Sequence, residues 1–476
     1  MSLARDLTME ALEHQAKSSV AYQYARYALA MEHDMIPGAV LHAAKRSLLD
    51  TLGVAIGAFD APGFPMMYRL ARGNGGPGEA TVFGSGFRAT AGYATLANSF
   101  LVRFLDYNDC GGGGHNSDSI PCILAVSEKY QKSGRDFLTA VILSYELGSR
   151  FCSGALLPFY AQDFIMDIRC GVTLPPPVGR LMGMNAMQIA NAIGVCASHS
   201  LPLGILDTNR EANYNVKNLR VGFVARDAID ACLLAEQGFT GPVRIVEGEH
   251  GLCDVVLKGQ ADLEKMVNFS GWRMLDVRYK DMCCNANSMG HVMATLQNVI
   301  ENDIHYEDVE AIKVVTGMHE SRHTTSLWKK YPLNAETADH SAFFTNAVAI
   351  KERRYDVQSM HSDHFTDPDI IALIDKMQVI GDPALPEYGF VGISEITVKD
   401  GRTFIKRVEK PHGFGDDPHT DRELEQKFRS MACRYFSDAH IDRLIDMVWN
   451  VETLPTMEPL VQMMILKDDV LPASGS

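Results

Sequence analysis

The sequence contains no run of Lys and Arg residues, and its 476 residues carry a formal net charge of −15 at pH 7. Contact with nucleic-acid phosphates requires a basic face, and anionic membranes attract basic surfaces rather than acidic ones. The chain also lacks the apolar run of about 18 residues that a membrane-spanning helix needs. We therefore expect neither a nucleic acid nor a membrane as a partner.

The first fifteen residues, MSLARDLTMEALEHQ, include acidic side chains and no apolar core, so they lack the features of a secretory signal or a transit peptide. The ten cysteines are scattered without a CxxC pair, and only Cys283 and Cys284 are adjacent. Scattered thiols are typical of a reducing compartment rather than of a disulfide framework. A cytoplasmic location is therefore expected.

Motifs for metals and nucleotides are missing as well. The chain has no HExxH, no P-loop, and no GxGxxG after an expected strand. The glycine-rich stretch GNGGPGEATVFGSG, residues 73–86, follows a helical pattern and predicts a loop that leads into a short hairpin. We expect no bound cofactor and no metal.

Apolar residues are plentiful. The chain is 46% hydrophobic and 22% charged, which is the composition of an ordinary globular protein. Up to about residue 265 the apolar residues recur every three or four positions, as in VLHAAKRSLLDTLGVAIGAF, and this spacing predicts successive amphipathic helices. Frequent Ala, Gly and Ser on their apolar faces allow close packing. The first unit is expected to be all helical.

The pattern changes between about residues 270 and 405, where β-branched residues alternate with polar ones in VEAIKVVTG and ISEITVKDGRTFIKRVE. Asp400-Gly401 is a hairpin signal. A helical pattern of apolar residues resumes at TDRELEQKF, where Thr420 and Glu423 form a capping box. The predicted fold class is mainly α, a large all-helical domain with an inserted smaller α/β lid domain. The expected boundaries are 1–268 for the first part of the helical domain, 269–408 for the lid and 409–476 for the C-terminal return.

Polar residues are densest in LDYNDCGGGGHNSDSIP, residues 105–121. Four consecutive glycines are costly in conformational entropy and indicate a backbone that a substrate approaches closely. Asp106 and His115 flank these glycines, and a carboxylate with an imidazole can exchange protons. The alternative is a solvated surface loop in which Asp118 caps the next helix. The density of polar groups makes this loop the best site candidate in the chain.

Three further polar segments carry candidate residues. Lys217 opens a helix in ILDTNREANYNVKNLRVGF, where the helix dipole is unfavourable, so a bound carboxylate would explain it; an ordinary surface lysine is the alternative. Asp339 and His340 precede an apolar helix and are at least as often caps as catalytic groups. Lys280 enters a helix in VRYKDMCCNANSMGH. The histidines expected to be ordinary surface or core residues are His319, His323, His361 and His364.

Several segments, taken in order, resemble the MmgE/PrpD family, which includes 2-methylcitrate dehydratase, cis-aconitate decarboxylase and iminodisuccinate epimerase. They are LLDTLGVAIGA, ATLANSFLVRFLDYND with HNSDSIP, LMGMNAMQIANAIGV, the block that begins VKNLRVGFVARDAIDAC, ETADHSAFF and PHGFGDDPHTDRELEQKF. Each match is modest, but the ordered set is specific and spans nearly the whole chain. The resemblance implies a large helical domain closed by the C-terminal helices, an inserted α/β lid and a homodimer.

The resemblance also implies site residues. The family pattern places a catalytic Asp at Asp106, a catalytic His at His115 and a site Lys at Lys217. His340 matches the ETADHS segment of the dehydratase branch, and His340 and Lys280 are expected to hold substrate carboxylates. Cys110 stands where the family has Thr or Ser, and Arg210 lies one place from a frequent family Arg, so both are further substrate-binding candidates.

Other positions depart from the family pattern. Met166 stands where dehydratases and decarboxylases carry a His, and Phe344 stands where the family has a Tyr. The family's lid lysine aligns with Tyr279, which leaves Lys280 one position away. The substrate is therefore expected to differ from methylcitrate.

The implied activity is that of a cofactor-independent lyase, a hydro-lyase similar to 2-methylcitrate dehydratase, which removes a proton alpha to a carboxylate of a small di- or tricarboxylate. Such a reaction needs a base, an acid and cations that stabilise the developing negative charge. His115 and Asp106 are expected to transfer protons as a coupled pair, while Lys217, Lys280 and His340 hold carboxylates. Decarboxylation, epimerisation and a catalytically weakened carboxylate-binding homologue remain alternatives, the last suggested by Met166 and Phe344.

Overall fold

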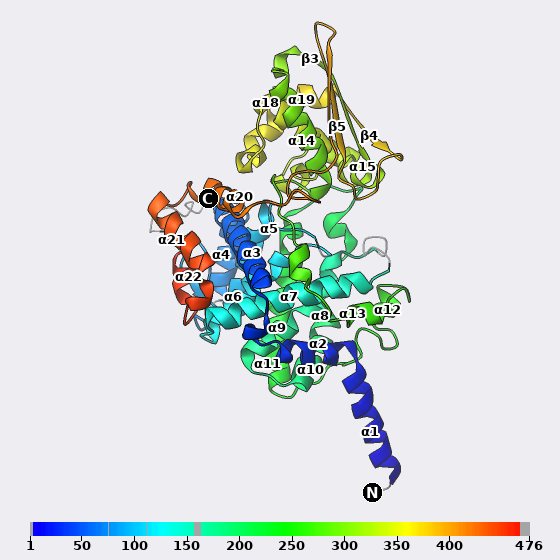
Figure 1. Ribbon diagram of the computed structural model, residues 1–476, viewed down its shortest axis with the longest axis vertical. Coiled ribbons are helices and arrows are strands. Elements are labelled where there is room, and N and C mark those ends of the chain that lie inside the picture. The colour runs from blue at the N-terminus through cyan, green and yellow to red at the C-terminus, as the bar shows by residue number, and fades with distance from the viewer. Residues whose placement is uncertain (1–2, 75, 112, 157–162, 467–476) are drawn as a thin grey trace.

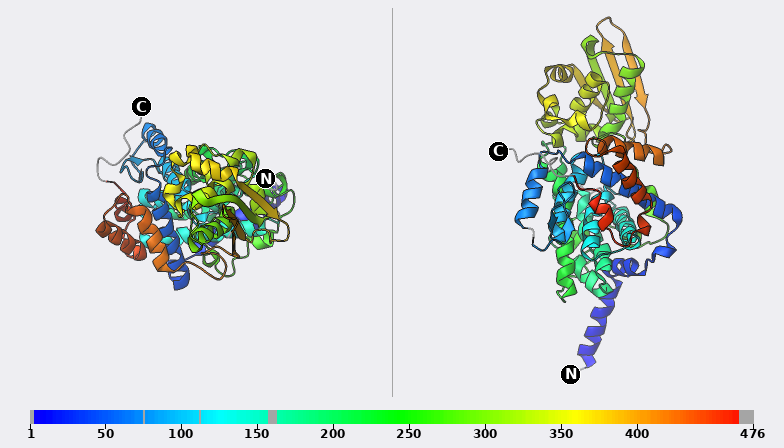
Figure 2. Two further views of the ribbon diagram at one scale, coloured as in Figure 1. Left: turned by 90° about the horizontal axis from the view of Figure 1, so that it is seen from above. Right: turned by 90° about the vertical axis from the view of Figure 1, so that its left-hand side faces the viewer.

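The computed structural model describes residues 3–74, 76–111, 113–156 and 163–466. A helical body forms the middle of the molecule, and a smaller part that contains both helices and strands stands on one end of it (Figure 1). Helix α1 (Leu3–Ser18) extends from the opposite end, as the right-hand view of Figure 2 also shows. Within the described residues, no helix is both long and apolar enough to cross a membrane.

The body is built from helices whose faces are lined with small residues. Its first part comprises α2 (Val20–Ala30), α3 (Gly38–Gly57), α4 (Phe64–Gly73), α5 (Ala91–Phe104), α6 (Ile120–Lys129), α7 (Gly134–Gly154), α8 (Cys170–Thr173), α9 (Pro175–Met182), α10 (Ala186–Ala197), α11 (Arg220–Glu236), α12 (Leu252–Val255) and α13 (Leu263–Met266). Helix α5 is central, because it packs against α3, α4, α6 and α11 and is buried along most of its length. Helix α5 ends at Phe104, directly before the polar loop of residues 105–121.

The glycine-rich stretch at 73–86 leads into a short hairpin, as predicted. Strands β1 (Ala80–Thr81) and β2 (Arg88–Ala89) pair antiparallel. Residue 75 of this stretch lies outside the described residues.

The smaller part contains a four-stranded sheet in the order β4-β3-β5-β6. Its elements are α14 (Ala286–Glu301), β3 (Val309–Gly317), α15 (Met318–Thr324), α16 (Leu327–Lys330), α17 (Ala335–Ala338), α18 (Ala342–Glu352), α19 (Pro368–Asp375), β4 (Met377–Asp382), β5 (Gly392–Val398) and β6 (Thr403–Val408). Strands β3 and β4 are parallel, whereas β5 pairs antiparallel with β3 and with β6. The predicted turn joins β5 to β6, and Gly401 adopts the positive φ of 90° that this turn requires. Helix α14 packs on β5 and β6.

The last helices return to the body. They are α20 (Asp421–Ala432), α21 (Asp438–Trp449) and α22 (Glu458–Gln462), and the predicted capping box at Thr420 and Glu423 starts the first of them. Helix α20 packs along α3, where Gly53 lets Phe428 come so near that a Cβ would lie 2.9 Å from its ring. Lys427 of α20 pairs with Asp50 of α3 at 2.7 Å between Nζ and Oδ1. The predicted fold class, mainly α with a small α/β part, is confirmed.

Candidate active site

Asp106 lies directly after α5 and forms the centre of a buried charge cluster. Its φ of 45° is unusual for a residue with a side chain, and this left-handed conformation turns the chain sharply into the following loop. The carboxylate is fully buried, and its Oδ1 lies 2.6 Å from Nζ of Lys280 and 3.1 Å from Nη1 of Arg103. Oδ2 lies 3.5 Å from Nζ of Lys217. Burial alone would raise the pKa of Asp106, but Arg103, Lys280 and Lys217 together hold this pKa well below its ordinary value. The carboxylate therefore stays ionised and is a weak base.

Lys217 connects the body to the α/β part. It belongs to the 3₁₀ turn Asn215–Leu219 that precedes α11, and its side chain is fully buried. Besides Asp106, its Nζ contacts Oδ2 of Asp339 at 2.6 Å. The alternative of an ordinary surface lysine is wrong.

Lys280 approaches the same carboxylate from the segment before α14. Its Nζ donates to the backbone oxygen of Asp106 at 2.6 Å as well as to the carboxylate, and to the backbone oxygen of Cys284 at 3.1 Å. Three contacts from one ammonium group fix both the side chain and the unusual backbone of Asp106.

His340 lies between α17 and α18, but it does not cap either helix. Those caps are Asn334 and Ser341, whose side chains accept the capping hydrogen bonds. Nδ1 of His340 contacts the Asp339 carboxylate and lies 3.8 Å from Oδ2 of Asp106. The interpretation of Asp339 and His340 as mere caps is therefore wrong, and both belong to the buried cluster.

His115 is held by a backbone contact within its own loop. Its Nδ1 lies 2.5 Å from the backbone oxygen of Asp109, so Nδ1 carries the hydrogen and Nε2 keeps a lone pair. Burial lowers the pKa of His115 well below the ordinary value, and the positive charges of Arg103 and Lys280 lower it further. This imidazole is neutral, as a general base must be.

The loop around His115 is not a solvated surface loop. Asp118 is buried and accepts a hydrogen bond from Nδ2 of Asn108 at 2.8 Å, rather than capping a helix. Asp109 accepts hydrogen bonds from Ser117 Oγ at 2.5 Å and from the Tyr145 hydroxyl at 2.7 Å. Burial nevertheless raises the pKa of Asp109 to about 7. Gly112 lies outside the described residues.

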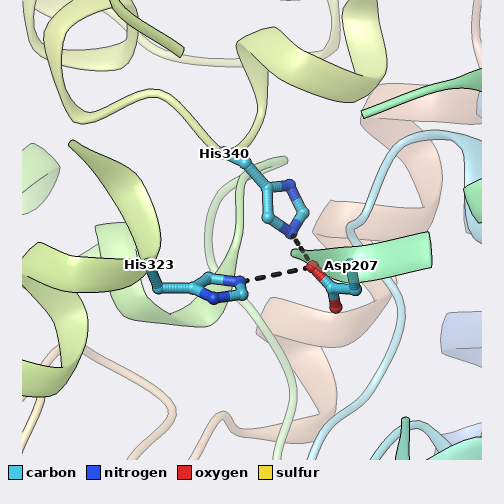
Figure 3. A group of neighbouring side chains, drawn as sticks. All are labelled: Asp207, His323 and His340. Carbon is cyan, nitrogen blue, oxygen red and sulfur yellow. Dashed lines mark ion pairs between the residues drawn. The ribbon is translucent and has the colours of Figure 1, made fainter. Parts of the chain in front are cut away.

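Several residues of the cluster gave no signal in the sequence. Asp207 ends the 3₁₀ turn Gly204–Asp207, and its Oδ1 lies 3.1 Å from Nε2 of His340 and 3.3 Å from Nε2 of His323 (Figure 3). The expectation that His323 is an ordinary histidine is wrong in this respect, because its ring faces the site. Lys329 donates to the backbone oxygens of Thr208 and His323 at 2.8 and 2.7 Å, and burial lowers its pKa to about 8.

A chain of buried ion pairs joins Asp207 to the His115 loop. Arg220 pairs with Oδ2 of Asp207 at 2.7 Å and with Oδ2 of Asp167 at 2.6 Å. Arg169 pairs with Asp167 at 3.1 Å and also donates to the backbone oxygen of His115 at 3.1 Å. The two histidine-bearing regions of the site are thus held in one rigid network.

Two groups of described side chains come close enough to share a metal ion, namely Asp106 with Asp339 and His340, and Asp207 with His323 and His340. In the first group both carboxylates already receive lysine ammonium groups. In the second group, two imidazoles and one oxygen of a carboxylate face one another (Figure 3), and Arg220 pairs with the other oxygen of that carboxylate.

Two family models match this chain, the MmgE/PrpD N-terminal domain over residues 22–264 and the MmgE/PrpD C-terminal domain over residues 282–453. The chain belongs to the MmgE/PrpD family. Cis-aconitate decarboxylase from Aspergillus terreus is 22% identical over 96% of this chain and 98% of its own length. The cis-aconitate decarboxylase of Homo sapiens is 22% identical over 87% and 88%, and the 2-methylcitrate dehydratase of Salmonella typhi is 23% identical over 96% and 95%. These names denote lyases, and the prediction of a lyase of this family is confirmed at that level.

Tyr279 and Lys280, the two residues at the expected position of the lid lysine, contact different parts of the molecule. Tyr279, which aligns with that lysine, directs its hydroxyl to Ser47 Oγ of the body at 3.0 Å. Lys280, its neighbour, reaches Asp106 instead. The structure therefore places a lysine at the charge cluster even though the aligned position holds a tyrosine.

Other departures from the MmgE/PrpD pattern leave apolar groups near the site. Met166 borders the glycine loop, since a Cβ on Gly114 would lie 2.5 Å from its sulfur. Phe344 is buried and packs against Phe365, with 5.5 Å between ring centroids. These positions supply no proton-transfer group in this chain.

Two predicted substrate-binding residues lie apart from the cluster's charged contacts. Cys110 is held by backbone hydrogen bonds with Arg278, at 2.8 and 2.9 Å, and burial raises the pKa of its thiol to about 12. Arg210 is exposed in the loop between the two 3₁₀ turns that carry Asp207 and Lys217. The structure brings together Asp106, Lys217, Lys280 and His340, with His115 on the adjoining loop.

Proposed function

We propose that this protein is a hydro-lyase that removes a proton alpha to a carboxylate of a small di- or tricarboxylate and expels a hydroxyl group. The observation that carries this proposal is the surplus of buried positive charge around Asp106. In the ion pairs among the described residues, the three cations Arg103, Lys217 and Lys280 pair with two carboxylates, those of Asp106 and Asp339. A buried excess cation favours an anionic ligand, because the low dielectric strengthens their attraction.

The neutral imidazole of His115 is the base in this proposal. Its Nε2 takes the alpha proton, and the lysines stabilise the negative charge that develops on the substrate carboxylate. The imidazolium that results then protonates the leaving hydroxyl. Asp106, held ionised by three cations, orients those cations rather than carrying the proton itself.

Decarboxylation is the second candidate, because relatives that cover nearly the whole chain are named cis-aconitate decarboxylases. Both reactions pass through a carbanion beside a carboxylate, and the same cations would stabilise it. The test is incubation of the protein in D₂O with citrate-like, tartrate-like and amino-dicarboxylate compounds, followed by NMR. Loss of water supports the hydro-lyase and loss of CO₂ supports the decarboxylase. Alpha-H/D exchange alone supports an epimerase, and melting shifts without turnover support a binding protein.

Lys217 provides the sharpest single test of the charge surplus. Lys217→Ala should raise KM and lower kcat together, because the ammonium group contacts both the ground state and the developing charge. Lys132→Ala, which alters a lysine outside the buried cluster, is the matched control. An unchanged Lys217→Ala enzyme would reject the scheme.

We also propose that the protein is a cytoplasmic homodimer. All ten cysteines are free, which suits a reducing compartment. Exposed large apolar side chains are frequent in two chain segments, residues 203–216 and 327–333, which the hydrogen bond from Lys329 to the Thr208 backbone at 2.8 Å connects. They are Leu203, Ile205, Tyr214, Val216, Leu327, Trp328 and Leu333. Exposed apolar surface is typical of subunit interfaces, and light scattering of the protein and of Trp328→Glu tests this assignment.

A further inference from the structure

Asp207, His323 and His340 converge from three separate elements. Asp207 ends the 3₁₀ turn Gly204–Asp207, His323 lies on α15, and His340 lies between α17 and α18. Figure 3 shows both rings pointing a nitrogen at the same carboxylate oxygen. Oδ1 of Asp207 lies 3.1 Å from Nε2 of His340 and 3.3 Å from Nε2 of His323, and all three atoms lie within 4.8 Å of one another.

The hydrogen-bond partners of His340 leave no proton on its Nε2. Asn285 has a fixed orientation, because its Oδ1 accepts the Asn287 N–H at 2.9 Å. Its Nδ2 therefore faces Nε2 of His340 at 2.6 Å and must donate to it. The other ring nitrogen faces the Asp339 carboxylate, which can only accept, so Nδ1 carries the hydrogen.

His323 has the same arrangement. Its Nδ1 lies 2.5 Å from Oδ1 of Asn209, so Nδ1 donates and Nε2 keeps its lone pair. Oδ1 of Asp207 is buried and receives no hydrogen bond from the described residues. Three electron-pair donors thus face one another with no hydrogen between them, an arrangement that a cation stabilises.

The far sides of all three groups are already anchored. Asp339 holds His340, Asn209 holds His323, and Arg220 holds Oδ2 of Asp207 at 2.7 Å. Metal-binding histidines usually donate their other ring N–H to a carboxylate or carbonyl in this way. The two N–O distances also suit a tetrahedral ion, since ligands bound at about 2.0 to 2.1 Å lie roughly 3.3 Å apart.

We propose that Asp207, His323 and His340 form a binding site for a divalent transition-metal ion of the zinc type. Two imidazoles and one carboxylate are a donor set that leaves a position open for a further oxygen ligand. That ligand is water or a carboxylate or hydroxyl oxygen of the substrate, because His340 also borders Asp106. The ion displaces Asn285 from Nε2 of His340. No sequence motif predicts this site, because Asp207 and His323 lie 116 positions apart and His323 and His340 lie 17 positions apart.

The test uses the full chain, stripped with a chelator and titrated with Co²⁺ in the absence of substrate. We expect one Co²⁺ per chain with the visible absorption of a four- or five-coordinate ion, and Zn²⁺ should displace it. His323→Ala and the isosteric Asp207→Asn should lose this absorption at the Co²⁺ concentration that saturates the unaltered protein. Asn209→Ala, which removes only the support of His323, should weaken binding about 10- to 100-fold.

His361→Ala is the matched control, because this exposed histidine lies on the same part of the chain. It should bind Co²⁺ like the unaltered protein, and circular dichroism checks that each variant folds. Absence of stoichiometric Co²⁺ binding by the unaltered protein overturns the site, as does equal loss in His361→Ala and His323→Ala. The spectrum needs no turnover, so failure of the hydro-lyase proposal leaves this result intact, and absence of metal leaves the lyase proposal standing.

Discussion

The two halves of the candidate site differ in how they are assembled. The body contributes one continuous loop, in which Asp106 and His115 are separated by a few residues, together with Lys217 from the start of α11. The α/β part contributes Lys280, His323 and the pair Asp339 and His340, which come from three separate segments. Lys217 joins the halves, because it contacts Asp106 on one side and Asp339 on the other. The body half therefore supplies the base, His115, and the carboxylate of Asp106. The α/β half adds the ammonium group of Lys280 to the cations around this carboxylate, which requires that the two parts pack together.

The largest expected effect is loss of the base in the body half. His115→Asn keeps an N–H that can donate to the Asp109 backbone oxygen, but it removes the proton-accepting Nε2. We expect kcat to fall about 10²- to 10⁴-fold, as for loss of a general base, measured by the NMR assay with the best substrate of the panel. His250→Asn, at an exposed histidine of the body, is the control. If His115→Asn left kcat undiminished, His115 would not be the base, and the base would have to lie in the α/β half of the site.

The next effect compares two neighbours in the α/β half. Lys280→Ala removes the ammonium that contacts Asp106, and kcat/KM should fall about 10²-fold or more, as for loss of one group that stabilises developing charge. Tyr279→Phe removes the hydroxyl that contacts Ser47 and the backbone oxygen of Ala43, so it should cost about 1 kcal/mol of stability and leave kcat/KM unchanged. Kinetics and urea unfolding of both variants check this pair. A larger kinetic loss in Tyr279→Phe than in Lys280→Ala would assign the lid position to residue 279.

Residues that are consecutive in the sequence could be predicted as a site, whereas residues from separate segments could not. The helical body follows from apolar spacing, and the loop of Asp106 and His115 is visible because its polar residues are consecutive. Asp207 and His323 could not be found in this way, because they lie 116 positions apart in the sequence and no fixed spacing relates them. The lysine at 280 shows a further limit. An alignment gives the position of a backbone residue, whereas the turn before α14 decides which of two adjacent side chains enters the site.

Asp109 offers a pH-dependent test of burial in the body half. A carboxyl group whose pKa is raised in the folded state binds its proton more tightly there than in the unfolded chain, so stability falls as the pH rises between the two pKa values. With a pKa of about 7 against the ordinary value of 3.8, this window runs from about pH 4 to pH 7, and the full difference is on the order of 4 kcal/mol. Asp109→Asn should flatten this part of the slope in urea unfolding at pH 5, 6, 7 and 8.

Asp276→Asn, at an exposed carboxylate, is the matched control and should leave the slope unchanged. If Asp109→Asn retained the full slope of the unaltered protein, the carboxyl group of Asp109 would have to be ionised across this range. The loop would then carry one more negative charge against the cations of the α/β half.

The smallest expected effect concerns Arg210, which lies in the loop between the 3₁₀ turns of Asp207 and Lys217. Its side chain is exposed, and an exposed charge is screened by water and salt, so Arg210→Ala should change KM by less than about twofold. Steady-state kinetics at low and at physiological ionic strength check this, because any steering of an anionic substrate by Arg210 would appear only at low salt. A tenfold rise in KM at both salt concentrations would contradict the expectation. It would mean that substrate binding draws the 208–214 loop inward and adds a cation from the body to those that the α/β half already provides.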